Sequence, residues 1–305
     1  MKQKPISFLK KLAHGPLAPF VRVALEMVVH IQLWWLELMW KLGGIPAATE
    51  DQQARMRQKV TFVFKSFQRQ GLAKRLYKNI QRYYPGVRVI IADDSKEPLT
   101  LTGPGLTVVQ LPFNSGLSRG LNAALERVET PFVVRMDDDE LLTPYAKFHE
   151  QLEFLLEHPE VDLAAVLPRN LPLERRWKKS LDYYVNEPMG HAPKPLKIPH
   201  GTWIDCSHVV LGKVPNIFLA RTEKYRALGY DDNIRMLDHQ NFFFRAAGNL
   251  VSAVDVDAYV LHHHNRFDRS YQRYREDVME DRRYIHMRYS GFVRNAPWGR
   301  RTDNK

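Results

Sequence analysis

The sequence predicts an α/β fold, in which a mostly parallel central sheet carries helices on both faces. Short β-branched runs alternate with amphipathic stretches of helical period from residue 60 onward. Acidic clusters directly follow two of these β-branched runs. The 305 residues are 44% hydrophobic and 26% charged, which is the balance of a globular protein and excludes a disordered one.

Residues 1–58 form the first predicted segment, and they contain an amphipathic helix over residues 19–44. Four lysines precede it. Its polar positions fall within about 100° of one another on a helical projection; they are Arg22, Glu26, His30, Glu37 and Lys41. A membrane-spanning segment is not indicated, since each central charge costs about 2.5–3.5 kcal/mol. Two interpretations stay open: a helix on a membrane surface, which the lysines favour, and a helix packed on this protein or a partner.

The second predicted segment, residues 59–264, begins after a polar linker. Its order of strand, helix, strand, strand, helix and strand indicates parallel pairing with crossover helices. A serine, Ser118, can cap the second of these helices. The expected strands lie at 60–66, 87–93, 106–111 and 131–136, and the expected helices at 71–84 and 118–128.

The rest of the chain is less regular. Residues 168–208 are rich in proline, basic and aromatic residues and are expected to form long loops with little regular structure. Residues 265–305 form the third predicted segment, a basic, Arg- and Tyr-rich helical extension. The other expected elements are a helix at 145–158, a strand at 161–167, a strand at 216–220, helices from 222 and around 239–248, and a strand at 250–261.

Four carboxylates, Asp137 to Glu140, follow the strand at 131–136. Ligands of parallel sheets bind beyond the carboxyl ends of the strands, and Asp93 and Asp94 end a strand at the same edge. Adjacent carboxylates repel one another in a shielded cleft, so a divalent cation such as Mg²⁺ or Mn²⁺ is expected among them. The alternatives are an acidic turn at 137–140 and an Asx turn at one of the first two aspartates.

Composition and motifs limit the compartment, the binding partners and the chemistry that the sequence can support. The single cysteine, Cys206, excludes an intramolecular disulfide and favours a reducing compartment. A net charge of +11 favours polyanionic partners, which include phosphate ligands, acidic lipid and nucleic acid. No Gly-rich phosphate loop of Walker type supports a phosphotransferase, and the adjacency of Cys206, Ser207 and His208 does not establish a catalytic triad.

The spaced motifs "IIADDS", "NSGLSRGLN" and "VVRMDDDE" resemble the nucleotide-binding half of GT-A glycosyltransferases of the family-2 type. The stretches "VPNIFLARTEKYRALGYDDNI", "DHQNFFFRAAG" and "VLHHHN" are similar to the β-1,4-N-acetylgalactosaminyltransferases. The likeness covers residues 60–264. It implies a Rossmann-like GT-A fold, a UDP-sugar donor, an inverting mechanism and a divalent metal that bridges the diphosphate.

The resemblance also assigns roles to residues. Asp94, with Asp93 beside it, matches the uracil-contacting aspartate, and Asp137 and Asp139 match the metal- and nucleotide-binding pair, with Asp138 between them. The stretch "NSGLSRGLN" departs from the family pattern, because Leu121 stands where arginine is usual. The remaining implied residues are Arg119 as a substitute cation for the donor, His262 as a metal ligand, and Asp238 or, as second choice, His239 as the base.

The resemblance therefore predicts an inverting, metal-dependent transferase that moves a hexosamine, with GalNAc favoured, from a UDP-sugar to a glycan or lipid-linked glycan. One alternative is a UDP-Gal or UDP-Glc transferase. Another is a non-catalytic module that binds polyanions or anionic membranes through the basic tail. The predicted location is the cytoplasm, at the inner face of a membrane, and nucleic acid is not an expected partner.

Overall fold

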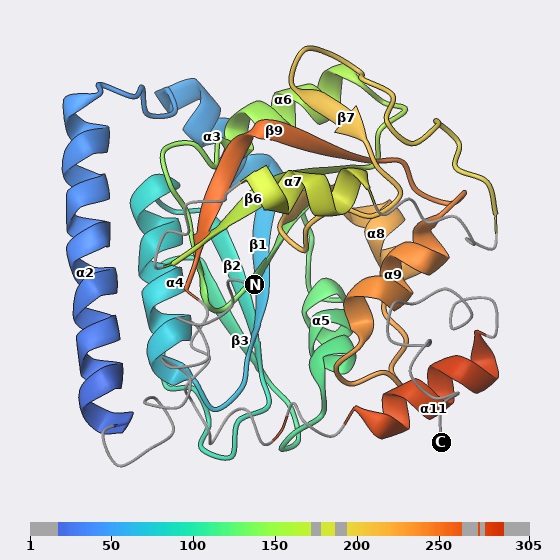
Figure 1. The fold of residues 1–305 in the computed structure, drawn as a ribbon, viewed down its shortest axis with the longest axis horizontal. Coiled ribbons are helices and arrows are strands. Elements are labelled where there is room, and N and C mark those ends of the chain that lie inside the picture. Colours follow the sequence, from blue (N-terminus) through green and yellow to red (C-terminus); the bar gives the residue numbers. More distant parts are fainter. Residues whose placement is uncertain (1–17, 172–177, 187–193, 264–273, 275–277, 290–305) are drawn as a thin grey trace, which may run out of the picture.

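A nine-stranded sheet forms the centre of the protein (Figure 1). The computed structural model describes residues 18–171, 178–186, 194–263, 274 and 278–289. The strand order is β3-β2-β1-β4-β8-β6-β9-β5, and β7 pairs with β9. The strands are β1 (Val60–Ser66), β2 (Arg88–Asp93), β3 (Leu106–Gln110), β4 (Phe132–Asp137), β5 (Glu140–Leu141), β6 (Leu163–Asn170), β7 (His208–Val210), β8 (Phe218–Arg221) and β9 (Ser252–His262).

The predicted parallel sheet is confirmed for the strands that precede the acidic cluster. β1 pairs in parallel with β2 and β4, and β2 pairs in parallel with β3. The other half is mixed, because β8 runs antiparallel to both of its neighbours, β4 and β6, while β6 and β9 are parallel. The carboxyl ends of β1 and β4 consequently lie side by side, with Lys65 aligned with Asp137.

Helices cover both faces of the sheet, as predicted. Because side chains alternate along a strand, Phe62 and Phe64 of β1 join one core while Val63 joins the other. The first core receives side chains of α3, α4 and α6, and the second those of α5, α8 and α9. These helices are α3 (Glu50–Lys59), α4 (Gln70–Tyr83), α5 (Leu117–Leu125), α6 (Phe148–Glu157), α8 (Thr222–Leu228) and α9 (Asp238–Ala246).

Three local predictions are wrong. The expected linker contains helix α3, which Thr49 and Gln52 start with a reciprocal capping box. The expected loop at 168–208 includes helix α7 (Lys178–Val185). Helix α5 begins at Leu117 with Gly116 as its cap, at φ 99°, so Ser118 is already inside the helix and does not cap it. Only glycine adopts that backbone readily, and a β-carbon at Gly116 would also press against Arg235.

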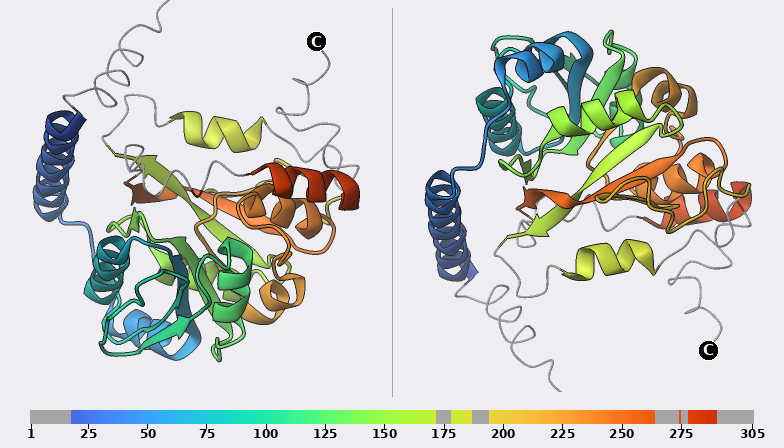
Figure 2. Two further views of the ribbon diagram at one scale, coloured as in Figure 1. Left: turned by 90° about the horizontal axis from the view of Figure 1, so that it is seen from below. Right: turned by 90° about the horizontal axis from the view of Figure 1, so that it is seen from above.

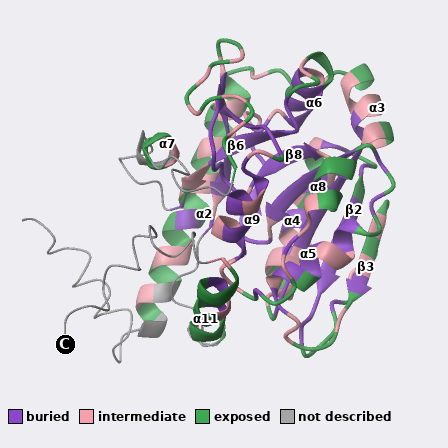
Figure 3. Cartoon of the chain, turned by 90° about the vertical axis from the view of Figure 1, so that its right-hand side faces the viewer, coloured by how far each residue is buried: buried purple, intermediate pink, exposed green. Residues whose placement is uncertain are grey.

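The terminal helices contribute few side chains to the two cores. Helix α2 (Ala18–Leu42) runs along one side of the molecule beside α4, as Figures 1 and 2 show. Val29 of α2 belongs to the second core, and Leu33, Leu36 and Trp40 pack against it. Helix α11 (Met279–Arg288) is the described part of the predicted C-terminal extension, and both helices are largely exposed in Figure 3. Within the described ranges, no helix has the length and apolar character needed to cross a membrane. The lysines before α2 and residue His264 lie outside the described residues.

Candidate active site

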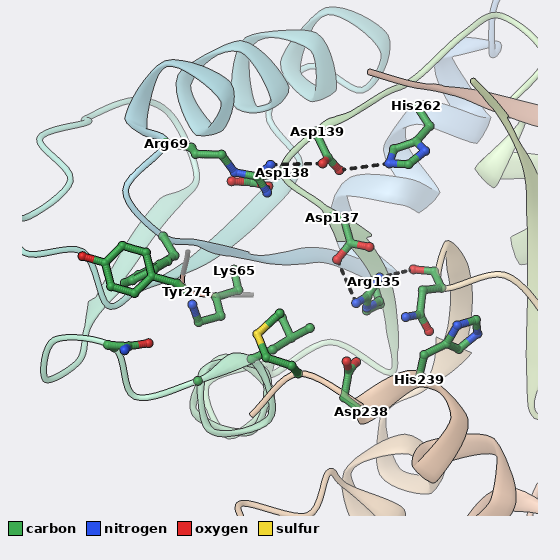
Figure 4. Close-up of a pocket in the computed structure, with 16 residues that line it drawn as sticks. Lys65, Arg69, Arg135, Asp137, Asp138, Asp139, Asp238, His239, His262 and Tyr274 are labelled. Atoms are coloured by element: carbon green, nitrogen blue, oxygen red, sulfur yellow. Dashed lines mark hydrogen bonds and ion pairs between the residues drawn. The ribbon is translucent and has the colours of Figure 1, made fainter. Parts of the chain in front are cut away.

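A cavity of about 290 Å³ opens at the carboxyl ends of β1 and β4 (Figure 4). Residues from β1, β4, the turn after β4, the start of α9 and the end of β9 line it. Its volume is at the lower end of the range for ligand pockets, about 300–1,000 Å³. The predicted residues on its wall are Asp137, Asp138, Asp139, Asp238, His239 and His262. Six predicted residues from three separate stretches of the sequence therefore meet in one cavity.

Strand pairing brings His262 to the acidic turn. The short strand β5 pairs antiparallel with β9, and Glu140 lies opposite His262. The backbone N–H of His263 donates to the carbonyl oxygen of Asp139 at 2.8 Å, which fixes the same register. The imidazole Nε2 of His262 lies 3.5 Å from Oδ1 of Asp139. Glu140 serves the turn itself, because its buried carboxylate accepts the backbone N–H of Asp137 at 2.8 Å.

Arginines neutralise the three aspartates. Arg69 binds the carboxylates of both Asp138 and Asp139, and Arg135 lies 2.8 Å from Oδ1 of Asp137. Burial raises the pKa of Asp138 to about 7, although Arg69 opposes the shift. Burial acts in the same direction on Asp139, but His262 and Arg69 outweigh it and hold the pKa of that carboxyl below its usual range. The site thus holds one strongly anionic carboxylate, Asp139, beside an imidazole.

The donor set can be tested for a divalent cation. Two ligands about 2.1 Å from one metal ion lie about 3 Å apart, so Asp139 and His262 fit a shared ion after a small adjustment. Asp137 faces Arg135 instead. Over the part of the chain that the structure describes, no group of three metal-ligand side chains is gathered. Two protein ligands leave room for diphosphate oxygens, which is the usual arrangement for magnesium with phosphate substrates.

Asp238 reaches the cavity from the first turn of α9. It is buried, and its Oδ2 has no hydrogen-bond partner among the described residues. Burial raises the pKa of Asp238 to about 6, while Arg135 moderates the increase. Figure 4 shows Asp238 and the Asp139–His262 pair on opposite sides of Arg135 and Asp137. A carboxylate with an unused oxygen, facing a cavity, is suited to accept a proton.

His239 is less suited to that role. Its Nε2 lies 2.9 Å from the carbonyl oxygen of Val214, and since a carbonyl only accepts, Nε2 must carry the proton. Burial lowers the pKa of His239 to about 3. The ring therefore stays neutral and weakly basic.

The other residues predicted to bind the sugar-nucleotide donor do not line the cavity. Asp93 forms the Asx-type turn, because its carboxylate accepts the backbone N–H of Ser95 at 3.4 Å; it also accepts the hydroxyl of Ser95 and the N–H of Leu99. Asp94 is fully buried and binds Nζ of Lys65 and the N–H of Gly116. Arg119 is exposed, donates to the carbonyl oxygen of Asp232 and does not line the cavity. The geometry therefore gives no support to Arg119 as the donor's cation, since its position on α5 directs it away.

The basic residues of the cavity were missed from the sequence. Lys65, Arg69 and Arg135 all line it, at the ends of β1 and β4. The strand-end rule that located the aspartates applies equally to Lys65 and Arg135, which lie near the ends of β1 and β4, and it would have found these two. Tyr274 also lines the cavity, where it meets Phe67 edge-on at 5.0 Å and Phe113 at 6.1 Å between ring centroids. No sequence signal pairs Tyr274 with these two rings, because even Phe113, the nearer of the two in sequence, is 161 positions away.

Helix α11 holds the loop that leads to Asp238. The carboxylate of Asp281 is buried and accepts three successive backbone N–H groups, those of Arg235, Met236 and Leu237, at 2.7 to 3.1 Å. Such a nest of N–H donors fixes the path of the chain around an anion. Asp281 is therefore a positioning residue for Asp238.

Replacing Asp281 with alanine is expected to lower kcat and leave the affinity for nucleotide nearly unchanged. The variant leaves three partly buried N–H groups without their acceptor, so the free energy of unfolding should fall by about 1–3 kcal/mol. Glu280→Ala removes an exposed carboxylate from the same helix and serves as the control. Turnover kinetics and thermal melting check both variants. Equal kcat for Asp281→Ala and Glu280→Ala would contradict the positioning role.

Comparisons with known proteins agree with this arrangement. The model of the family described as Glycosyl transferase family 2 matches residues 61–218. Human Beta-1,4 N-acetylgalactosaminyltransferase 1 is 32% identical over 206 residues, which are 67% of this chain and 38% of the human one. The amylovoran biosynthesis glycosyltransferase AmsE of Erwinia amylovora is 42% identical over 59 residues, 19% of this chain and 22% of that protein. The chain spans only 38% of the length of the mammalian relatives.

Solved structures share the fold at low identity. The mannosyltransferase PcManGT from Pyrobaculum calidifontis, in complex with GDP-Man and Mn²⁺, has a TM-score of 0.52 at 17% identity and covers 87% of this chain and 74% of its own. S. aureus TarS in complex with UDP has a TM-score of 0.51 at 16% identity, over 68% of this chain and 60% of that one. At these identities the likeness establishes the architecture alone.

Proposed function

Because the chain belongs to glycosyl transferase family 2 and has the GT-A fold, we propose that it is an inverting, metal-dependent enzyme that transfers a hexosamine from a UDP-sugar to a glycan hydroxyl. One observation carries the proposal: a metal-competent pair, Asp139 and His262, and a buried carboxylate with an unused oxygen, Asp238, line the same cavity. An inverting transfer needs these two functions in one cavity, a counter-charge for the leaving diphosphate and a base for the acceptor.

GalNAc is the favoured sugar, since the mammalian relatives are named N-acetylgalactosaminyltransferases. A structure of S. aureus TarS holds UDP-GlcNAc, so a UDP-hexosamine is the broader class. UDP-Gal and UDP-Glc are the alternatives that a donor panel must include. The acceptor is a glycan, carried on a lipid at the inner face of a membrane.

The protein's own groups divide the work. Arg69, Lys65 and Arg135 supply positive charge along the cavity, which attracts and orients an anionic diphosphate. A bound Mg²⁺ or Mn²⁺, held by Asp139 and His262, would stabilise the negative charge that develops on the leaving UDP. Asp238 accepts the proton of the acceptor hydroxyl as that oxygen attacks the anomeric carbon from the face opposite the leaving UDP. No covalent sugar intermediate is required.

A donor panel tests the proposal. UDP release is measured from UDP-GalNAc, UDP-GlcNAc, UDP-Gal and UDP-Glc, each with Mn²⁺, Mg²⁺ or EDTA. We expect release from a hexosamine donor with metal and its loss with EDTA. Release that is insensitive to EDTA would reject metal dependence, and salt-sensitive polyanion binding without release from any donor would favour a non-catalytic module instead.

The pH dependence follows from Asp238. The base acts in its ionised form and burial raises the pKa of Asp238 to about 6, so kcat/KM should rise with pH, reach half its maximum near pH 6 and then level off. A rate profile with UDP affinity measured at each pH checks this. A profile that stays flat through pH 6, at constant UDP affinity, would move the base elsewhere.

A further inference from the structure

Helix α2 differs from an ordinary surface helix, because it carries apolar side chains on its outward side as well as on the side packed against the protein. Between Val23 and Met39 the exposed residues are apolar except for His30, and the side chains of Glu26 and Glu37 are half-buried. Its exposed large apolar side chains, between 39% and 74% accessible, are Phe20, Val23, Met27, Val28, Ile31, Trp34, Trp35, Leu38, Met39 and Leu42. Isolated exposed apolar residues are common, but a continuous face of this size marks an interaction surface. We call these ten residues the outward face.

Two acids of the polar stripe join α2 to neighbouring elements. Glu37 pairs with Arg82 of α4 at 2.8 Å, and Oε1 of Glu26 lies 3.5 Å from Nε2 of His263. Apolar contacts supplement these pairs: Val29 is buried, and Leu33, Leu36 and Trp40 pack against the second core. The two acids lie in different halves of the helix, so α2 is fastened along its length. Its outward face is therefore presented lengthwise, over about 37 Å for 25 residues.

Charge decides which partner fits this face. Four lysines precede the helix in the sequence, Lys41 ends it, and the whole chain carries +11. A second copy would bring two strongly cationic chains together, whereas an anionic lipid surface attracts each basic residue by about 1 kcal/mol. The exposed Trp34 and Trp35 are also typical of side chains at the boundary between lipid and water. We propose that the outward face of α2 is buried in the interface of an anionic lipid bilayer, with the helix parallel to the membrane plane.

The same helix lies next to the catalytic cavity. Arg75 of α4 lies 3.0 Å from Nδ1 of His263, and since arginine only donates, Nε2 of His263 carries the proton and points at Glu26. His263 directly follows His262 on the cavity wall. Membrane-bound α2 therefore holds the cavity close to the lipid surface. This position of the cavity favours a lipid-carried glycan as the acceptor, an inference that rests on the proposed function.

Sedimentation with vesicles tests the proposal without any need for catalysis. The full-length protein is mixed with phosphatidylcholine vesicles that contain about 30% phosphatidylglycerol, at low and at high salt. We expect binding that persists at high salt, because burial of apolar side chains is not screened by ions. Trp34→Glu should weaken binding about tenfold or more. The control is Trp203→Glu, which changes an exposed tryptophan outside α2 and should bind as the native protein does.

Four outcomes would overturn the proposal. They are no binding by the native protein, complete release at high salt, an equal loss for both variants, and a dimer of the native protein that Trp34→Glu dissociates. Quenching of tryptophan fluorescence by brominated lipids needs no variant, so it remains decisive if Trp34→Glu fails to fold. Brominated lipids should quench the tryptophan fluorescence of the native protein. Absence of quenching would also reject an outward face embedded in the membrane.

Discussion

Replacing Asp139 with asparagine is expected to lower kcat/KM by about 1,000-fold or more and to remove the dependence of UDP binding on metal. The substitution keeps the size of the side chain and removes the anionic oxygen that lies 3.5 Å from His262. It also removes one of the two carboxylates that Arg69 binds. Titration of UDP with Mn²⁺, followed by turnover with the preferred donor, measures both effects.

Asp257→Asn is the matched control for Asp139. Asp257 is an exposed aspartate on β9, the strand that carries His262, and it does not line the cavity. Its substitution should leave UDP binding and turnover unchanged. If the Asp139 variant binds UDP with Mn²⁺ as tightly as the native protein does, Asp139 is not a metal ligand.

Replacing Asp238 with asparagine is expected to lower kcat by about 100- to 10,000-fold, the usual contribution of a positioned general base. UDP affinity should change little, because the basic side chains of the cavity lie on other elements than α9: Lys65 on β1, Arg69 before α4 and Arg135 on β4. The dependence of the rate on pH near 6 should disappear with the carboxylate. Steady-state kinetics with saturating donor, together with UDP titration, separates binding from transfer.

Asp238 also lies in the first turn of α9, where a negative charge stabilises a helix by about 0.3–1 kcal/mol. Glu223→Gln removes an exposed acid from the first turn of α8 and controls for that effect on stability. Turnover near the native rate in the Asp238 variant would assign the base to another residue. Loss of UDP binding with retained chemistry would assign Asp238 to the donor.

The parallel half of the sheet could be predicted because its signals are local. β-branched runs, amphipathic periods and Pro85-Gly86 mark the elements, and the strand-end rule then places Asp137 and Asp139 at the ligand edge. Helix α3 was missed because its composition is polar, although Thr49 and Gln52 carry a readable capping signal. The helix at 178–185 lies in a stretch whose composition indicates loops.

Long-range pairing accounts for most of what the sequence did not show. Arg69 reaches Asp138 and Asp139 across about 70 positions, and its place depends on where β1 ends and α4 begins. The structure gives Arg119 no support as the cation, because the start of α5 at Leu117 turns it toward Asp232. The meeting of His262 with Asp139 was implied by the family resemblance alone, and the β5–β9 pairing supplies its physical cause.

The orientation of α2 is the clearest example of a feature that could not be predicted from the sequence. The helix and its narrow polar stripe were predictable, but the side that faces the protein was not. Solvent ordinarily takes the polar side of a surface helix. Here Arg82 and His263 supply partners for Glu37 and Glu26, and those partners become known only once α4 and β9 are placed.

Calorimetric titration of the native protein with UDP, with Mn²⁺ present and again after EDTA, tests the central claim most directly. If Asp139 and His262 hold a divalent metal that offsets the charge of a nucleotide diphosphate, UDP should bind with Mn²⁺ and lose most of its affinity after chelation. Failure of UDP and of every UDP-sugar to bind with Mn²⁺ or Mg²⁺ would contradict the claim that this cavity is the donor site of a UDP-sugar transferase.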